Sequence, residues 1–271
     1  MRSLEQVQHW PVKNAAAAVV TTDGSATTGD TARVYRLASV TKPLVAYAAL
    51  VAVEEGAIEL DQPAGPPGST VRHLLAHTSG VAFATPEVIA APGARRIYSS
   101  AGFELLADFV TANTGIEFPQ YLHEAVFEPL GMTSAVLDGS AGHAGHASLR
   151  DLTLFAAELL TPQLISRQTY DEATSVQFPD RDGVLPGYGS QRPNDWGLGF
   201  EIRNGKTPHW TGSGNSTRTY GHFGQSGTFL WLDPEIGVAT IALTDENFGD
   251  WARTTWPKFS DSVIAETHNT Q

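Results

Sequence analysis

The 271-residue chain has no cysteine, only four lysines and no long apolar run. The absence of cysteine excludes disulfides, thiolate metal sites and a cysteine nucleophile. Lysine and arginine together number 17 against 29 acidic residues, which gives a formal charge of −12. Nucleic acids and anionic membrane surfaces are held chiefly by Lys and Arg, so neither is expected as the main partner.

The hydrophobic segments are too short to cross a membrane. The longest nearly apolar stretch, residues 44–53, is about half the length that a bilayer requires. The first ten residues, MRSLEQVQHW, lack the apolar core of an export signal, so we expect a cytoplasmic protein. With 41% apolar and 17% charged residues, the composition is that of a globular chain with one large domain or two intimate ones.

The hydrophobic pattern predicts strands at both ends of the chain and helices between them. Short runs rich in β-branched and aromatic residues predict strands, and apolar residues at helical spacing predict helices. The expected strands are 12–22, 33–37, 196–202, 217–223, 228–232 and 238–243. The expected helices are 39–55, 69–77, 100–113, 119–127, 149–160 and 251–266, with Ser69 capping the second and Ser148 with Asp151 capping the fifth. This order favours a sheet domain that carries a helical insertion.

The sharpest local motif is Ser39-Val40-Thr41-Lys42 at the start of the first expected helix. The three-residue spacing puts Ser39 and Lys42 on one helical face near the positive end of the helix dipole. A serine hydroxyl needs an adjacent base, and a lysine can serve if burial lowers its pKa enough to keep it neutral. Alternatively, Ser39 is only a helix cap and Lys42 a solvated first-turn residue.

Further motifs in order along the chain extend this pattern. They are RLASVTKP (36–43), VRHLLAHTSGV (71–81), PGARRIYSSAGFELLADFV (92–110), FEPLGM (127–132), GHAGHASLRDL (142–152), WGLGF (196–200) and YGHFGQSGTFLWLDPE (220–235). With them the chain resembles the serine β-lactamase and penicillin-binding protein superfamily. The most similar branch contains class C β-lactamases, D-alanyl-D-alanine peptidases and β-lactamase-like carboxylesterases.

The resemblance implies a role for each matching residue. Ser39 matches the acylated nucleophile and Lys42 its base partner. Tyr98 matches the tyrosine that shuttles protons to the leaving group, a task suited to a phenol whose pKa is lowered by a neighbouring ammonium. His222 opens the third motif on a strand that lines the cleft, and the amides of Ser39 and Gln225 match the oxyanion hole.

Two departures from the family pattern bear on the substrate. Ser100 stands where relatives have asparagine, which weakens the expected hydrogen bonds to Lys42 and to a substrate amide. Phe223 replaces a threonine hydroxyl that helps relatives to hold a substrate carboxylate, whereas Gly224 keeps the room for close backbone approach. Both departures favour an ester of a small or medium carboxylic acid over a β-lactam or a peptide C-terminus.

Other candidate motifs are set aside. Two histidine pairs, His73 with His77 and His143 with His146, have spacings that metal ligands could use, but neither has a nearby carboxylate motif. We therefore expect structural hydrogen bonding and no metal. Residues 206–208 imitate the third motif, although a proline there removes the strand donor. The sequence Gly-x-Ser-x-Gly of α/β-hydrolases is absent.

The sequence thus predicts an α/β (α+β) protein of β-lactamase/transpeptidase-like fold, with an antiparallel sheet flanked by helices. We expect residues 1–60 and 165–271 to form the sheet domain and residues 61–164 an inserted helical domain. The expected function is a carboxylesterase that forms an acyl-enzyme, needs no cofactor and acts on a small-molecule ester or amide. A β-lactamase or D-alanyl-D-alanine peptidase activity on the same residues, or a non-catalytic relative that binds a ligand in the cleft, remain open alternatives. The sequence leaves the oligomeric state undetermined.

Overall fold

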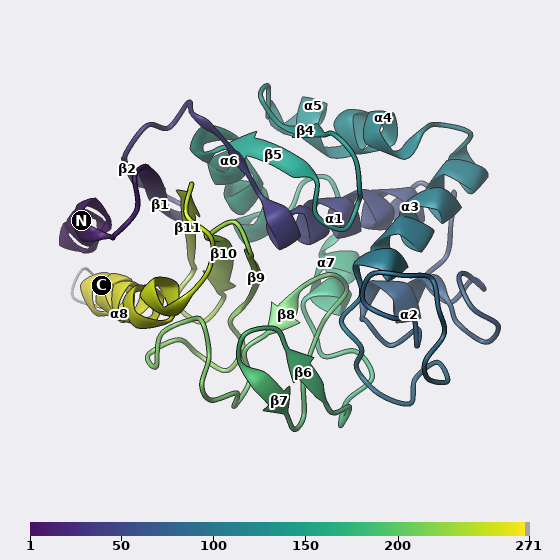
Figure 1. Cartoon of the computed structure of the whole chain (residues 1–271). Coiled ribbons are helices and arrows are strands. Elements are labelled where there is room, and N and C mark those ends of the chain that lie inside the picture. Colours follow the sequence, from purple (N-terminus) through teal and green to yellow (C-terminus); the bar gives the residue numbers. More distant parts are fainter. Residues whose placement is uncertain (269–271) are drawn as a thin grey trace.

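A computed structural model describes residues 1–268, and its central element is a six-stranded antiparallel sheet (Figure 1). The strand order is β2-β1-β11-β10-β9-β8, so the two ends of the chain meet between β1 and β11. The strands are β1 (Ala15–Thr21), β2 (Gly24–Thr28), β8 (Glu201–Ile202), β9 (Tyr220–Gly224), β10 (Thr228–Asp233) and β11 (Val238–Thr244). The expected antiparallel sheet is therefore present.

Helices cover both faces of this sheet. Helix α6 (Leu149–Leu160) packs on one face against β1 and β11, and α8 (Asp250–His268) with the 3-10 helix η1 (Arg2–His9) covers the other. Ala16 and Ala18 of β1 join the core under α6, whereas Ala17 and Val19 join the core under α8. Because both faces are buried, β1 is a continuous apolar run without polar alternation.

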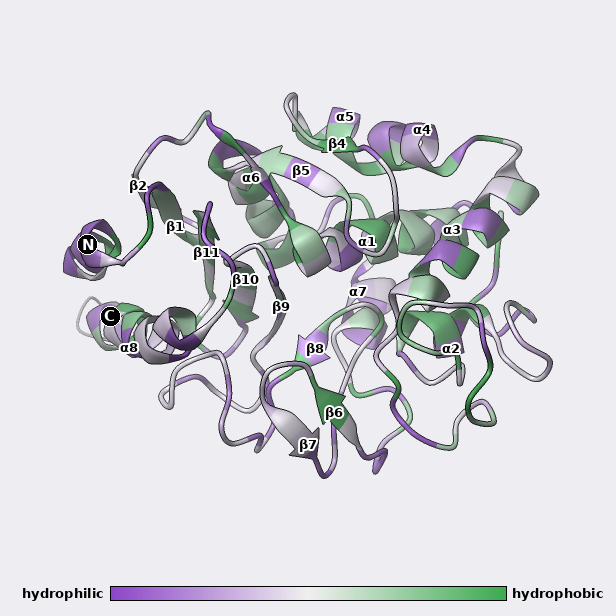
Figure 2. Ribbon diagram, viewed as in Figure 1, coloured by the Kyte–Doolittle hydropathy of each residue, from purple (hydrophilic) through white to green (hydrophobic). Residues whose placement is uncertain are grey.

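The helical region lies beside the sheet and surrounds α1 (Thr41–Glu54). Nearly every residue of α1 is buried, which fits a helix that is apolar on all sides (Figure 2). The region's other helices are α2 (Val71–Leu75), α3 (Ser100–Thr114), α4 (Phe118–Leu122), the π-helix η3 (His123–Phe127) and α5 (Glu128–Leu130). Helices α3, α4 and η3 pack against α1, so the start of α1 lies where the helical region meets the sheet.

Short elements complete the fold. A three-stranded sheet of order β3-β5-β4 contains β3 (Val34–Arg36), β4 (Val136–Leu137) and β5 (Gly145–Ser148). The strands β6 (Gly183–Leu185) and β7 (Gly189–Gln191) form a hairpin, and α7 (Arg167–Ala173) precedes it. In the described residues 1–268, no helix is long and apolar enough to cross a membrane.

Several local predictions are confirmed and two are wrong. Ser148 and Asp151 form the expected capping box of α6. Thr70, not Ser69, caps α2, since the Thr70 side chain accepts the amide of His73. Residues 196–202 do not form one strand, because the chain turns back on itself and Trp196 pairs with Glu201.

The proposed division into domains stays a prediction. The assigned insertion, residues 61–164, includes α6, although α6 packs against the sheet. The sequence pattern identified α6 as a helix but held no signal for the layer to which it belongs.

Candidate active site

Ser39 lies at the end of the sheet, in the short 3-10 helix η2 (Ala38–Val40) that leads into α1. The preceding residue, Ala38, has a positive φ of 46°, a backbone conformation that L-residues rarely adopt. The hydroxyl of Thr228 on β10 donates to the carbonyl of Leu37 at 2.9 Å and so ties this turn to the sheet. Ser39 is thus held in a fixed, strained turn between the two halves of the fold.

Lys42 is completely buried one helical turn further on. Its Nζ donates to the hydroxyl of Ser100 at 3.1 Å and to the carbonyl of Gly142 at 2.8 Å. Burial lowers the pKa of Lys42 to about 7, against a smaller opposing effect of Glu104. The alternative interpretation of Lys42 as a solvated residue is therefore wrong, and Ser100 keeps the hydrogen bond that its short side chain put in question.

The expected hydrogen bond between the Lys42 amine and the Ser39 hydroxyl is not among the contacts of the described residues. Among the described residues, the hydrogen-bond partners of the Lys42 amine are Ser100 and Gly142. Ser39 lies instead beside Tyr98 in the wall of one cavity, where its hydroxyl acts to lower the pKa of the phenol. The Lys42 amine lies 4.5 Å from the centre of the Tyr98 ring, so the three groups form one cluster.

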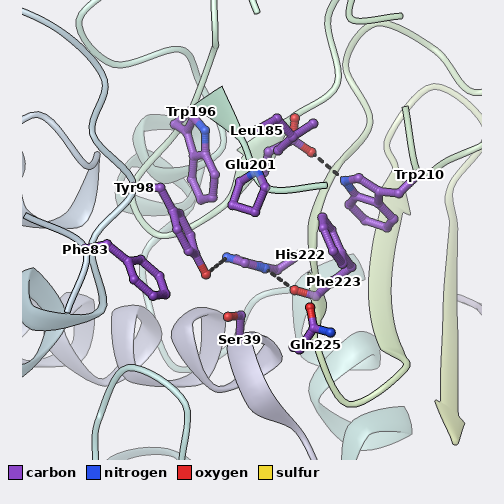
Figure 3. Close-up of a pocket in the computed structure, with 11 residues that line it drawn as sticks. Ser39, Phe83, Tyr98, Leu185, Trp196, Glu201, Trp210, His222, Phe223 and Gln225 are labelled. Atoms are coloured by element: carbon purple, nitrogen blue, oxygen red, sulfur yellow. Dashed lines mark hydrogen bonds between the residues drawn. The ribbon is translucent and has the colours of Figure 1, made fainter. Parts of the chain in front are cut away.

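A hydrogen bond joins Tyr98 and His222, and its donor can be assigned. His222 Nδ1 lies 2.7 Å from the carbonyl oxygen of Phe223, which can only accept, so Nδ1 carries the proton. Its Nε2 is then the acceptor for the Tyr98 hydroxyl at 3.4 Å, as Figure 3 shows. Burial, helped by the charge of Lys42, lowers the pKa of His222 to about 3. The imidazole is therefore neutral.

The expected lowering of the Tyr98 pKa is wrong. Burial raises the pKa of the phenol above its ordinary value, and the nearby Ser39 hydroxyl offsets this only in part. The nearby lysine has no lowering effect of that size because its amine lies over the ring face and is itself only partly charged at neutral pH. Tyr98 is thus a neutral hydroxyl that donates to His222.

A buried histidine, for which the sequence predicted structural hydrogen bonding over metal binding, positions this tyrosine. His77 Nδ1 accepts the backbone amide of Ser99 at 3.1 Å, and its ring lies 4.7 Å from the ring of Tyr98. Ser99 in turn caps α3 by accepting the amide of Gly102 at 2.8 Å. In residues 1–268, no group of three metal-ligating side chains is present.

Gly224 brings β9 against the turn that carries Ser39. A Cβ atom at this position would lie 2.3 Å from the carbonyl oxygen of Leu37 and 2.5 Å from the Thr228 hydroxyl. The close backbone approach expected of Gly224 is therefore required by the packing. Gln225, the next residue, faces the same cavity as Ser39 (Figure 3).

These residues surround a cavity of about 170 Å³ whose walls are mostly aromatic and aliphatic. Phe223 forms part of one wall and packs against Phe248 and Trp210. No lysine or arginine is among the residues that line the cavity, which are Ser39, Phe83, Tyr98, Leu185, Pro186, Trp196, Glu201, Trp210, His222, Phe223 and Gln225. The cavity is therefore suited to an uncharged group.

Among the residues that line the cavity, Glu201 is the one carboxylate, and no sequence motif pointed to it. Glu201 is buried, forms an ion pair with Lys206, and accepts hydrogen bonds from His209 Nε2 and from the indole N–H of Trp210, each at 3.0 Å. These partners lower the pKa of Glu201 although burial alone acts in the opposite direction. The segment 206–208, set aside as an imitation of the third motif, thus has a structural role: Lys206 neutralises this carboxylate.

A serine at the start of a buried helix, grouped with a buried lysine and a tyrosine around one apolar cavity, is the arrangement of a serine hydrolase. Comparison with known proteins agrees, because residues 11–261 match the model of the β-lactamase family. The chain belongs to this family, which confirms the fold class and the hydrolase class that the sequence predicted.

Individual relatives differ in the activities for which they are named. The crystal structure of a β-lactamase from Mycobacterium bovis is 60% identical, with a TM-score of 0.97 over 98% of this chain and 99% of that one. A hydrolase with promiscuous acyltransferase activity is 16% identical, with a TM-score of 0.78 over 97% of both chains, a likeness of fold. A candidate D-alanyl-D-alanine carboxypeptidase of Escherichia coli O157:H7 is 23% identical over 57% of this chain and 46% of its own length. The chain spans about half the length of the curated relatives that it matches.

Proposed function

We propose that this protein is a carboxylesterase that forms an acyl-enzyme on Ser39. The observation that carries the proposal is the position of Ser39 beside Tyr98 and the buried Lys42 in an apolar cavity without a cationic wall residue. A β-lactam or a peptide C-terminus brings a carboxylate into the site. Among the residues that line the cavity no cation is present to pair with such a group, and the carboxylate of Glu201 is already paired with Lys206, so a neutral ester fits better.

The reaction begins with the proton of Ser39. Its hydroxyl lies beside Tyr98, and Lys42, with a pKa of about 7, is the buried group near them that holds a proton most readily. With a pKa of about 3, His222 is too weak a base for this task and serves to orient the Tyr98 hydroxyl. The Ser39 oxygen attacks the ester carbonyl while its proton passes to the pair of Tyr98 and Lys42.

The remaining steps return every proton. The amides of Ser39 and Gln225 hold the negative oxygen of the tetrahedral intermediate. Collapse of this intermediate breaks the bond to the alkoxy oxygen, which takes the proton from the pair of Tyr98 and Lys42 and leaves as an alcohol. Water then adds to the acyl carbonyl and gives a proton to the same pair. Cleavage of the Ser39 ester releases the carboxylic acid and returns that proton to Ser39.

A covalent probe tests the nucleophile. We expect intact-mass spectrometry to show one added acyl or phosphonyl group after exposure to a fluorophosphonate, and none in the Ser39→Ala variant. Beside it, p-nitrophenyl esters are expected to turn over at least about tenfold faster than nitrocefin, since only the ester avoids burying a carboxylate in a cavity whose lining residues include no cation.

Two other outcomes would each favour one of the alternative functions. Rapid turnover of nitrocefin with negligible esterase activity would contradict the proposal and favour the β-lactamase named among the relatives. A Ser39 that no probe labels, together with retained ligand binding, would indicate a non-catalytic relative. The cytoplasmic location expected from the sequence stays a prediction.

The pH dependence of acylation tests the role of Lys42. The amine must be neutral to accept a proton, and its pKa is about 7, so kcat/KM for a p-nitrophenyl ester is expected to rise with pH and level off above about pH 8. The rise follows a single ionisation because His222 is already neutral throughout this range. A flat profile from pH 5.5 to pH 8.5 would exclude Lys42 as the proton acceptor.

A further inference from the structure

A second hollow opens beside the cavity that contains Ser39. It has a volume of about 430 Å³. Phe83, Tyr98 and Pro186 line both hollows, so the two adjoin each other. We call the second hollow the outer groove. Its own walls add the apolar side chains of Ile89, Ile97 and Val184, with Arg95 and Arg96 beside them. Strand β6, which carries Val184, is among the hydrophobic segments in Figure 2.

One wall of the outer groove is a loop that is fixed to α3. The carbonyl of Phe83 accepts the amides of Ser100 at 2.9 Å and Ala101 at 3.1 Å, so it caps the start of α3. At the base of the loop, the amide of Ile89 donates to the carbonyl of Gly80 at 2.9 Å. This wall is therefore positioned by the first residues of α3, one of which, Ser100, accepts a hydrogen bond from the Lys42 amine.

The opposite wall, β6, is fixed to the segment that leads into Tyr98. The amide of Arg96 donates to the carbonyl of Asp182 at 2.9 Å, and Arg96 pairs with Gly183 as a parallel bridge. The guanidinium of Arg96 is buried and donates to the carbonyls of Ala76 at 2.6 Å and Asn194 at 2.9 Å. The outer groove is thus a formed site between two anchored walls.

Its apolar side chains remain open to water. Phe83 and Ile89 are each 56% exposed and Val184 is 55% exposed, although they come from two distant segments of the chain. A cluster of large exposed apolar side chains beside a reactive cavity is typical of a ligand site. An apolar ligand in the groove would remove this surface from water.

We propose that the outer groove binds the alcohol part of the ester, and that this part is an apolar chain of several carbons. The proposal rests on the esterase function proposed above. Tyr98, which returns the proton to the alkoxy oxygen, separates the two hollows. Phe83 lies on one side of Tyr98, whereas Trp210 and Phe223 of the smaller cavity lie on the other (Figure 3). A short acyl group occupies the smaller cavity, and the alcohol extends past Tyr98 into the groove.

A series of alkyl acetates from ethyl to octyl tests this assignment. Every member forms the same acetyl-enzyme, so deacylation is identical throughout the series. Any difference in kcat/KM therefore arises in the acylation step, in which the alcohol is still present. We expect kcat/KM to rise roughly threefold for each added methylene until the groove is filled. The variants Ile89→Asn and Val184→Asn are expected to lower kcat/KM for octyl acetate about tenfold and to leave ethyl acetate unchanged. Val136→Asn, at a valine that is 51% exposed on the distant strand β4, is the matched control and should change neither substrate.

The possible failures are distinguishable. Hydrolysis of ethyl acetate with no dependence on alcohol length would overturn the assignment of the groove and leave the esterase function intact. Variants that alter the acyl-length series of p-nitrophenyl esters, but not the alkyl acetates, would place the acyl group in the groove instead. Absence of both ester hydrolysis and acylation of Ser39 would overturn the proposed function and this inference together.

Discussion

Replacing Lys42 with methionine is expected to lower kcat/KM about 10³- to 10⁴-fold and, at pH 6, to stabilise the protein. The rate falls because the variant has no amine to hold the proton of Ser39. The variant is more stable because it no longer buries an amine that is charged at pH 6. In the wild type, Lys42 is completely buried, which lowers its pKa from 10.5 to about 7. That shift corresponds to roughly 5 kcal/mol of unfavourable free energy. Loss of the hydrogen bonds to Ser100 and Gly142 offsets about half of it.

The sign of the stability effect depends on pH. Between pH 7 and pH 10.5 the unfolded chain keeps a proton on Lys42 that the folded protein has released. The unfolded state therefore binds more protons, and wild-type stability rises with pH across this window. The advantage of Lys42→Met should be largest below pH 7 and vanish or reverse near pH 10.

Urea unfolding at pH 6 and pH 9.5, with ester kinetics on the same samples, measures both effects. Lys258→Met removes an exposed lysine from α8 and serves as the matched control, with neither effect expected. A variant that is less stable than the wild type at both pH values would show that burial of the Lys42 amine does not destabilise the folded protein. Activity within tenfold of the wild type would remove Lys42 from the proposed mechanism.

Replacing Gly224 with alanine is expected to lower kcat about 10²- to 10³-fold at a smaller cost in stability, about 1 to 3 kcal/mol. The added Cβ would lie 2.3 Å from the Leu37 carbonyl oxygen, so β9 must move away from the turn that carries Ser39. The amide of Gln225, the proposed second oxyanion donor, moves with it. Mass spectrometry should still detect slow acylation of Ser39.

Gly205→Ala is the matched control, since a Cβ at Gly205 would meet no atom within 4 Å. It should keep wild-type kcat and stability. Equal loss of activity and of folded protein in Gly224→Ala would indicate a general packing defect in place of a misplaced oxyanion donor.

The parts of the fold that the sequence predicted well are those with a local cause. Strands β10 and β11 are apolar runs that end in turn residues, and α3 and α6 carry apolar residues at helical spacing. The capping box at Ser148 is likewise encoded within four residues. Strand β5 was missed, since its sequence, GHAS, has no hydrophobic alternation and it forms only by pairing with β3 and β4.

The sequence by itself determined which residues are candidates for the chemistry, because Ser39, Lys42, Tyr98 and His222 stand in ordered motifs. The tertiary structure alone decided how they connect. Lys42 donates to the carbonyl of Gly142, 100 positions along the chain, and Ser39 shares its cavity with Tyr98. Burial also decided the ionisation of each group, lowering the pKa of Lys42 while raising that of Tyr98. Burial and contact arise from segments that are distant in sequence, and no local pattern encodes them.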